Sequence, residues 1–274
     1  MDARIPFQPL PIDQSRVVYD HGPDSLRQPG VTAGRTTRLQ LTDPRAFPGT
    51  SRNVWVHAPA ATDGALPCMV FQDGGGFLDP EDDLRAGVVL DNLIAAGDIP
   101  PMVGVFVDPV ARNAEYDAFD SRYADLLADE VMPLVEQHVR VSDEPARRGL
   151  CGFSSGGSAA LTAAWHRPDA FGKVIGFSSS FPQVVGGNPY PELIASEPAT
   201  ALRVLLHVGH RDLGWDDHED NWLAENLLVA AALFRAGYDA RLVLGDGAHD
   251  SRHPGVLLPD ALRWLWRQEA VPCD

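Results

Sequence analysis

Residues 147–166 read RRGLCGFSSGGSAALTAAWH, and this stretch decides the fold. An apolar run comes first, a glycine-rich turn follows, and an alanine-rich run with a helical pattern completes it. A strand that leads through a tight turn into a helix is the first half of a βαβ unit, whose second strand lies parallel to the first. The stretch therefore predicts a parallel sheet.

The same alternation continues on both sides of this stretch. Strands are expected at 35–41, 52–58, 67–72 and 102–107 before it, and at 172–178, 201–209 and 240–244 after it. Helical patterns occupy about 84–97, 121–139, 219–236 and 259–266. The first two strands are suited to antiparallel pairing. We therefore expect an α/β protein with a mostly parallel central sheet and helices on both faces, an α/β/α sandwich.

Two parts of unequal length are expected along the chain. Residues 1–34 are rich in proline, glycine and polar residues without periodicity, which predicts an irregular N-terminal arm. Residues 35–274 show no repeat and no linker, and their length is ordinary for one α/β domain. We therefore expect a single domain over 35–274.

The composition excludes several classes of partner and chemistry. A formal net charge of −16 would repel nucleic-acid backbones and anionic membranes, so neither is an expected partner. Lys173 is the single lysine, which disfavours Schiff-base chemistry. The three cysteines are far apart, and the first residues lack the basic and apolar regions of a secretion signal. These features predict a cytoplasmic protein.

Residues 152–156, GFSSG, match the G-x-S-x-G pattern that places a nucleophilic serine on a sharp strand-to-helix turn. Ser154 is the predicted nucleophile, and the alternative is a glycine-rich turn with only a packing role. The letters GFSS recur at 176–179, but Ser180 stands where the second glycine would be, which argues against Ser178. A phosphate-binding loop would need a lysine here, and Cys151 lies inside the strand as expected of a packing residue.

A serine nucleophile needs backbone N–H groups that stabilise the oxyanion of the tetrahedral intermediate. Ser155 supplies one because it follows the nucleophile directly. The second is expected in MVFQDGGGFL, residues 69–78, after an early strand, and Gly75 is the predicted donor. The alternative is that these glycines only form a tight turn.

The acid and the base are expected later in the chain, in that order. Asp212 follows the strand at 201–209, and His249 follows the strand at 240–244, so we predict Asp212 as the acid and His249 as the base. The rival acids belong to an acidic run whose simpler interpretation is a solvated loop: Asp216, Asp217, Glu219 and Asp220.

A metal site is the competing interpretation of the histidines. His218 has no second histidine at a helical spacing in its run. His249 and His253 form an H-x3-H pair, but Gly247 before them and Pro254 after them argue against a helix there. We therefore predict no metal ligands and no cofactor.

The chain resembles the catalytic domain of enterochelin esterases and related carbohydrate-type esterases of the esterase D group. The likeness spans most of 30–267 and rests on 112–181, from RNAEY to GFSSSF, on HVGHRD at 207–212, and on 247–266. The resemblance implies an α/β-hydrolase fold and ester hydrolysis without a cofactor. It also implies a role at the mouth of the site for Arg112 and Glu115, for which an ion pair that fixes the loop is the alternative.

These observations predict a serine carboxylic-ester hydrolase that acts on a small-molecule ester through an acyl-enzyme. Phe77, beside the glycines, and Trp215, close to Asp212, are predicted to contact the substrate. Two alternatives stay open. The same triad could transfer the acyl group to an alcohol, or the fold could serve a non-catalytic binding protein.

Overall fold

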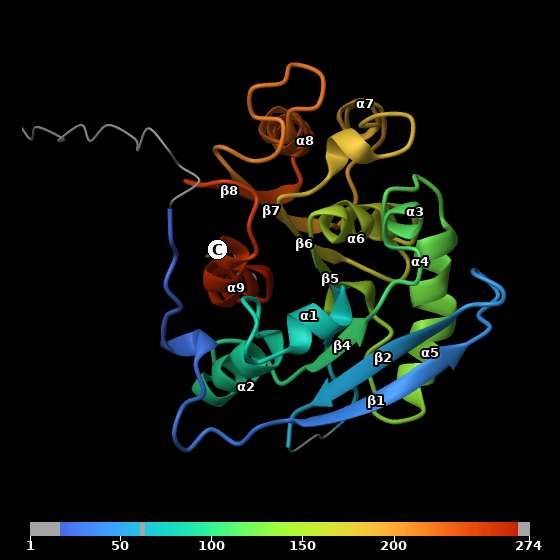
Figure 1. Cartoon of the computed structure of the whole chain (residues 1–274). Coiled ribbons are helices and arrows are strands. Elements are labelled where there is room, and N and C mark those ends of the chain that lie inside the picture. The colour runs from blue at the N-terminus through green and yellow to red at the C-terminus, as the bar shows by residue number, and fades with distance from the viewer. Residues whose placement is uncertain (1–16, 61–63, 268–274) are drawn as a thin grey trace, which may run out of the picture.

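The computed structural model describes residues 17–60 and 64–267, and an eight-stranded sheet runs through this part of the chain (Figure 1). The strands are β1 (Arg35–Thr42), β2 (Ser51–Ala58), β3 (Cys68–Gln72), β4 (Val103–Val107), β5 (Arg148–Phe153), β6 (Lys173–Phe177), β7 (Arg203–Gly209) and β8 (Asp239–Gly245). Their order is β1-β2-β4-β3-β5-β6-β7-β8. β1 and β2 pair antiparallel, as do β2 and β4, and the other neighbours pair parallel. The predicted mostly parallel sheet is confirmed.

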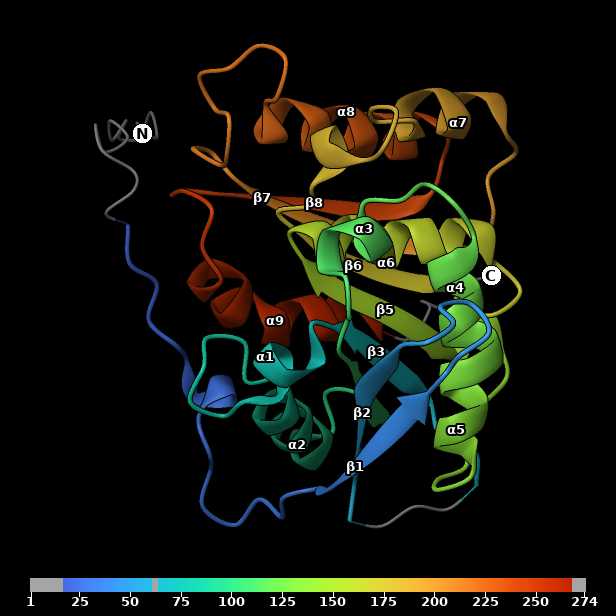
Figure 2. The ribbon, with the colours of Figure 1, turned by 45° about the vertical axis from the view of Figure 1, so that its right-hand side comes forward.

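Helices cover both faces of the sheet, as the sequence predicts (Figure 2). One layer contains α4 (Arg122–Leu126), a π-helical turn (Leu127–Val131), α5 (Met132–Glu136), α6 (Ser155–His166), α7 (Tyr190–Ser196) and α8 (Trp222–Arg235). The other contains α2 (Ala86–Ala96) and α9 (Arg252–Leu265). Two short helices, α1 (Gly74–Leu78) and α3 (Arg112–Tyr116), follow β3 and β4. Single turns of 3₁₀ helix lie at Pro23–Ser25, Pro145–Arg147 and Phe181–Gln183.

The central strands are mostly apolar because both of their faces are covered. All five residues of β3 are buried. Successive side chains of a strand point to opposite faces, so Val70 packs in the layer of α6 while Phe71 packs in the layer of α2 and α9. This two-sided core fixes the carboxyl ends of the parallel strands, where the chain carries its candidate catalytic residues.

Helix α9 begins earlier than predicted. It starts at Arg252 and includes His253 and Pro254, but His249 precedes it, so the two histidines of the H-x3-H pair do not share a helix. Proline is tolerated in the first turn of a helix, where its missing N–H would have no partner within the helix. The short helices α1, α3 and α7 were not predicted, because five to seven residues show too little periodicity.

Residues 17–34 lie along α2 and α9 (Figure 2). The Asn92 side chain donates to the carbonyls of Asp24 and Leu26, both at 2.8 Å, and Arg263 forms a 2.8 Å ion pair with Asp24. Residues 1–16 of the predicted arm lie outside the described residues, so the division at residue 34 stays a prediction. No helix in the described part of the chain is long and apolar enough to cross a membrane.

Candidate active site

Ser154 lies on the sharp turn between β5 and α6, in a backbone conformation that few non-glycine residues adopt. Its φ is 61° and its ψ is −128°. Its N–H donates to the Phe177 carbonyl at 2.9 Å. A Cβ atom at Gly152 would lie 2.0 Å from the Gly156 carbonyl oxygen, which leaves no room for any other residue there. The turn therefore requires the first glycine of the motif and holds Ser154 at the start of the helix.

Three separate loops bring the predicted nucleophile, base and acid together. His249 Nε2 is 3.2 Å from Ser154 Oγ, and His249 Nδ1 is 2.7 Å from Asp212 Oδ1. Asp212 follows β7, and His249 lies between β8 and α9. The chain of hydrogen bonds from serine through histidine to carboxylate is the arrangement that activates a serine hydroxyl.

Asp212 is buried, and its surroundings favour the carboxylate form. Burial by itself raises the pKa of Asp212, but the hydrogen bond and charge of His249 and the Leu213 N–H outweigh it, so the pKa is lowered. The Leu213 N–H donates to Oδ1 at 2.8 Å, and the Gly209 N–H donates to Oδ2 at 3.3 Å. Asp212 is therefore ionised at neutral pH and can orient the His249 ring.

Aromatic side chains hold the His249 ring from two sides. The Phe153 ring stacks on it with centroids 4.7 Å apart, and the Trp222 ring meets it edge-on at 4.9 Å. Phe153 precedes the nucleophile, while Trp222 is the first residue of α8. The imidazole thus has packing contacts as well as hydrogen bonds to fix its orientation.

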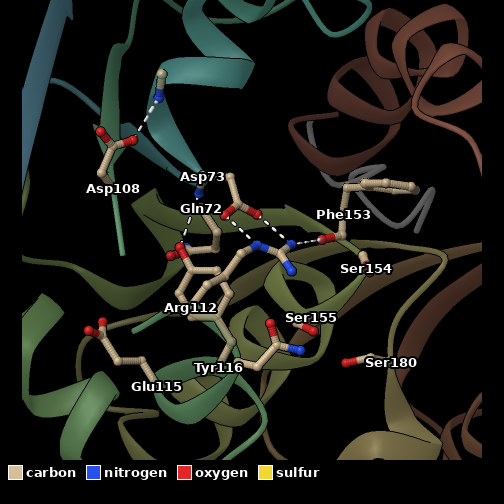
Figure 3. A network of polar contacts seen from close by, with 12 residues as sticks. Gln72, Asp73, Asp108, Arg112, Glu115, Tyr116, Phe153, Ser154, Ser155 and Ser180 are labelled. Atoms are coloured by element: carbon tan, nitrogen blue, oxygen red, sulfur yellow. Dashed lines mark hydrogen bonds and ion pairs between the residues drawn. The ribbon is translucent and has the colours of Figure 1, made fainter. Parts of the chain in front are cut away.

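The two predicted oxyanion donors differ in the structure. Ser155 is the first residue of α6, so its N–H has no acceptor within the helix and is suited to bind an oxyanion. The Gly75 N–H donates to Asp108 Oδ1 at 2.9 Å (Figure 3). The Gly75 N–H therefore already has an acceptor in Asp108. Its role as the second donor to the oxyanion stays a prediction.

Arg112 joins the turn after β3 to the nucleophile turn (Figure 3). Its guanidinium donates to both carboxylate oxygens of Asp73, at 2.7 and 2.8 Å, and to the Phe153 carbonyl at 3.3 Å. The Tyr116 hydroxyl accepts the Asp73 N–H at 3.0 Å. Arg112 therefore lies at the site as the resemblance implies, and its contacts are those of a residue that holds two loops together.

Two predicted substrate contacts are wrong. Glu115 is buried, forms a 2.6 Å ion pair with buried Arg52, and accepts the N–H groups of Val110 and Ala111. Phe77 is fully buried because the glycines before it form α1, which turns the ring into the core against Phe71. Neither side chain is accessible to a ligand.

The remaining candidates lie on the loop after Asp212. Trp215 is exposed, and the Arg211 guanidinium stacks on its ring at 3.9 Å, so Trp215 stays a predicted substrate contact. The rival acids Asp216, Asp217 and Glu219 are exposed, and Asp220 accepts a hydrogen bond from Gln183 at 2.7 Å. Only Asp212 of this group contacts His249 within the described residues.

The other histidines have different surroundings from those that a metal site requires. His218 is almost fully exposed, 3.6 Å from Asp217. His253 Nδ1 is 2.9 Å from His207 Nε2, and its ring stacks on Tyr19. Within residues 17–60 and 64–267, no group of three or more His, Cys, Asp and Glu side chains is arranged to hold a metal ion.

Comparison with known proteins identifies the family of this chain. Residues 46–254 match the family model Esterase, described as "Putative esterase". The chain belongs to this esterase family. An iron(III) enterobactin esterase of Dickeya dadantii (strain 3937) is 27% identical over 228 residues, which are 78% of this chain and 51% of the relative. The chain thus spans about half the length of that curated relative.

Solved structures share the α/β-hydrolase architecture. The enterochelin esterase of Shigella flexneri superposes with a TM-score of 0.72 at 25% identity, covering 88% of this chain and 60% of the other. A ferulic acid esterase superposes with a TM-score of 0.70 at 18% identity, covering 86% of this chain and 99% of the other. The likeness to the ferulic acid esterase covers nearly all of that smaller protein and shows that the two proteins share a fold.

Proposed function

We propose that this protein is a carboxylic-ester hydrolase that acts through an acyl-enzyme on Ser154. The observation that carries the proposal is the hydrogen-bonded chain from Ser154 Oγ through His249 to Asp212, with distances of 3.2 and 2.7 Å. Membership of the esterase family supports it, as do relatives named for enterobactin and ferulic acid esters.

In the proposed first step, His249 Nε2 accepts the Ser154 proton as Oγ attacks the ester carbonyl. The Ser155 N–H at the start of α6 stabilises the oxyanion, and the buried Asp212 carboxylate stabilises the imidazolium. His249 then protonates the leaving alcohol. Water attacks the acyl-enzyme by the same route in the second step and releases the carboxylic acid.

The proposal is tested with the purified protein and a panel of esters that includes acetylated sugars, feruloyl esters, short p-nitrophenyl esters and a catecholate lactone. Hydrolysis of at least one class, unaffected by EDTA, is expected. Formation of the methyl ester in place of the free acid when methanol is added at low concentration would identify acyl transfer instead. If no ester is cleaved and a fluorophosphonate probe labels nothing, a non-catalytic binding protein replaces the proposal.

Arg112→Lys should lower kcat/KM for the best ester by about 10- to 100-fold. A lysine carries one point charge and cannot bond both oxygens of Asp73 while also reaching the Phe153 carbonyl, so the two loops lose their fixed separation. A displacement of about 1 Å at a catalytic site can cost roughly 100-fold in rate.

The matched control is Arg122→Lys, because Arg122 is an exposed arginine paired with Asp120 at 2.8 Å on the helix layer. This variant should keep wild-type kinetics. Equal initial rates for Arg112→Lys and the wild type would show that Arg112 does not position the site.

A further inference from the structure

A buried carboxylate lies behind the nucleophile turn, and the mechanism above does not use it. Asp117 follows α3 and is 6% exposed. Its Oδ1 accepts the Ser180 hydroxyl at 2.7 Å, and its Oδ2 accepts the Ser155 hydroxyl at 3.1 Å and the Asn113 amide at 3.1 Å. All three partners are neutral groups. The Asp117 carboxylate is the common acceptor of their hydrogen bonds.

Both serines that contact Asp117 also touch the backbone of the nucleophile. Ser155 follows Ser154 directly and carries the N–H expected to bind the oxyanion. The Ser180 N–H donates to the Ser154 carbonyl at 3.2 Å. The Asp117 carboxylate is therefore connected to the Ser154–Ser155 peptide group in two ways. One connection passes through the Ser155 side chain, and the other passes through the Ser180 hydroxyl and the Ser180 N–H. Figure 3 shows Ser154, Ser155 and Ser180 beside one another.

A third hydroxyl closes the network. Ser158 Oγ lies 2.7 Å from Ser180 Oγ and 3.0 Å from the Ser155 carbonyl oxygen, and its single proton is shared between these two acceptors because the Ser180 proton is donated to Asp117. The side chains of Ser155, Ser158 and Ser180 are all buried, at 3% exposure or less. Buried hydroxyls that bond one another and a common acceptor have few alternative arrangements, so the network is rigid.

The nucleophile turn needs such support because Ser154 is strained. Its φ of 61° and ψ of −128° are unfavourable for a residue with a side chain, and such conformations persist only where the surroundings over-determine them. We propose that Asp117 is a positioning residue, which holds the Ser154 carbonyl and the Ser155 N–H in their catalytic orientation through Ser180 and Ser155. This inference rests on the proposed esterase function.

The chemistry of the position requires a carboxylate. Asp117 accepts three hydrogen bonds and donates none through its side chain. An asparagine of nearly equal size would present an NH₂ group to at least one of these donors. The serine hydroxyl or Asn113 amide that faces this NH₂ group would lose its acceptor and have to reorient, and the backbone that it holds would gain freedom.

The experiment compares Asp117→Asn with the wild type by steady-state kinetics on the best ester, with active sites counted by fluorophosphonate titration. We expect kcat per titrated site to fall by about 10- to 100-fold, with KM changed by less than about threefold, because the group acts on the transition state through the oxyanion donor. The rate constant of fluorophosphonate labelling should fall in parallel.

The matched control is Asp91→Asn on α2, on the opposite face of the sheet. Asp91 is a nearly buried carboxylate that accepts the Gly34 N–H and contacts His57 Nε2, both at 2.9 Å. It should lose thermal stability but keep wild-type kcat per site. The comparison separates a positioning role from general destabilisation.

A second variant keeps the inference testable if Asp117→Asn does not fold. Ser180→Ala removes the hydrogen bond between Ser180 and Asp117 and should lower kcat about three- to tenfold. In the double variant Asp117→Asn/Ser180→Ala, the loss should be smaller than the product of the two single losses, because both changes break the same contact. Unchanged kcat per titrated site in Asp117→Asn, or in Ser180→Ala, would overturn the positioning role while ester hydrolysis stands. A wild type that cleaves no ester and is not labelled would instead overturn the proposed function itself.

Discussion

Ser154→Ala should lower ester hydrolysis by about a millionfold, to the level left by the binding site alone. The hydroxyl is the attacking group, and alanine keeps the size of the residue without an oxygen 3.2 Å from His249 Nε2. The thermal unfolding transition should move by only a few degrees, since alanine bears the same strain at a positive φ as serine does. Initial rates and mass spectrometry of the fluorophosphonate adduct provide the measurement.

The control for this variant is Ser196→Ala, at the end of α7, where the hydroxyl donates to the Leu193 carbonyl on the surface. Its turnover and labelling should match those of the wild type. A Ser154→Ala protein that retains turnover, or is labelled at another serine, would show that the nucleophile lies elsewhere.

The sheet and the contacts of His249 with Ser154 and Asp212 were predictable because the signals that specify them are local. Each strand of the sheet is a short apolar run bounded by turn residues, and the chain order of serine, acid and histidine follows from the order of strands in this fold. Asp212 and His249 were placed simply as the first suitable residue after a strand. The folded chain brings them within hydrogen-bond distance of one another across 37 residues.

The errors at Phe77 and Glu115 have a common physical cause. Both residues stand next to motifs that the sequence singles out, but their side chains turn inward. Three glycines normally indicate a loop, yet here they form a short helix that places Phe77 in the core. Glu115 pairs with Arg52, a residue 63 positions earlier, and no local pattern shows such a contact.

The network behind the nucleophile was not predictable for a related reason. The chain contains 38 acidic residues, most of which have the appearance of surface groups. Asp117 differs from them because α6, the segment after β6 and α3 meet around it and bring Ser155, Ser180 and Asn113 to its oxygens. Which acid faces inward is decided by packing of segments far apart in sequence.

Asp212→Asn should lower turnover by about 10⁴-fold, the loss known for this change in a serine protease triad. The amide cannot accept the His249 Nδ1–H in the geometry that the carboxylate provides, and it carries no charge to stabilise the imidazolium. The lowered pKa of Asp212 means that the wild-type carboxylate is charged throughout the neutral range, whereas the asparagine amide is uncharged at every pH. The measurement is kcat per folded molecule near pH 7 and pH 9.

The matched control is Asp217→Asn, because Asp217 is exposed on the same loop and belongs to the acidic run that rivals Asp212. Its replacement should change turnover by less than about threefold, since an exposed side chain without contact to His249 contributes little. If Asp217→Asn were as damaging as Ser154→Ala and Asp212→Asn were mild, the loop would have to rearrange on substrate binding to bring a different carboxylate to His249. The nucleophile and the base would keep their roles in that case, because Ser154 and His249 contact each other directly and not through the loop.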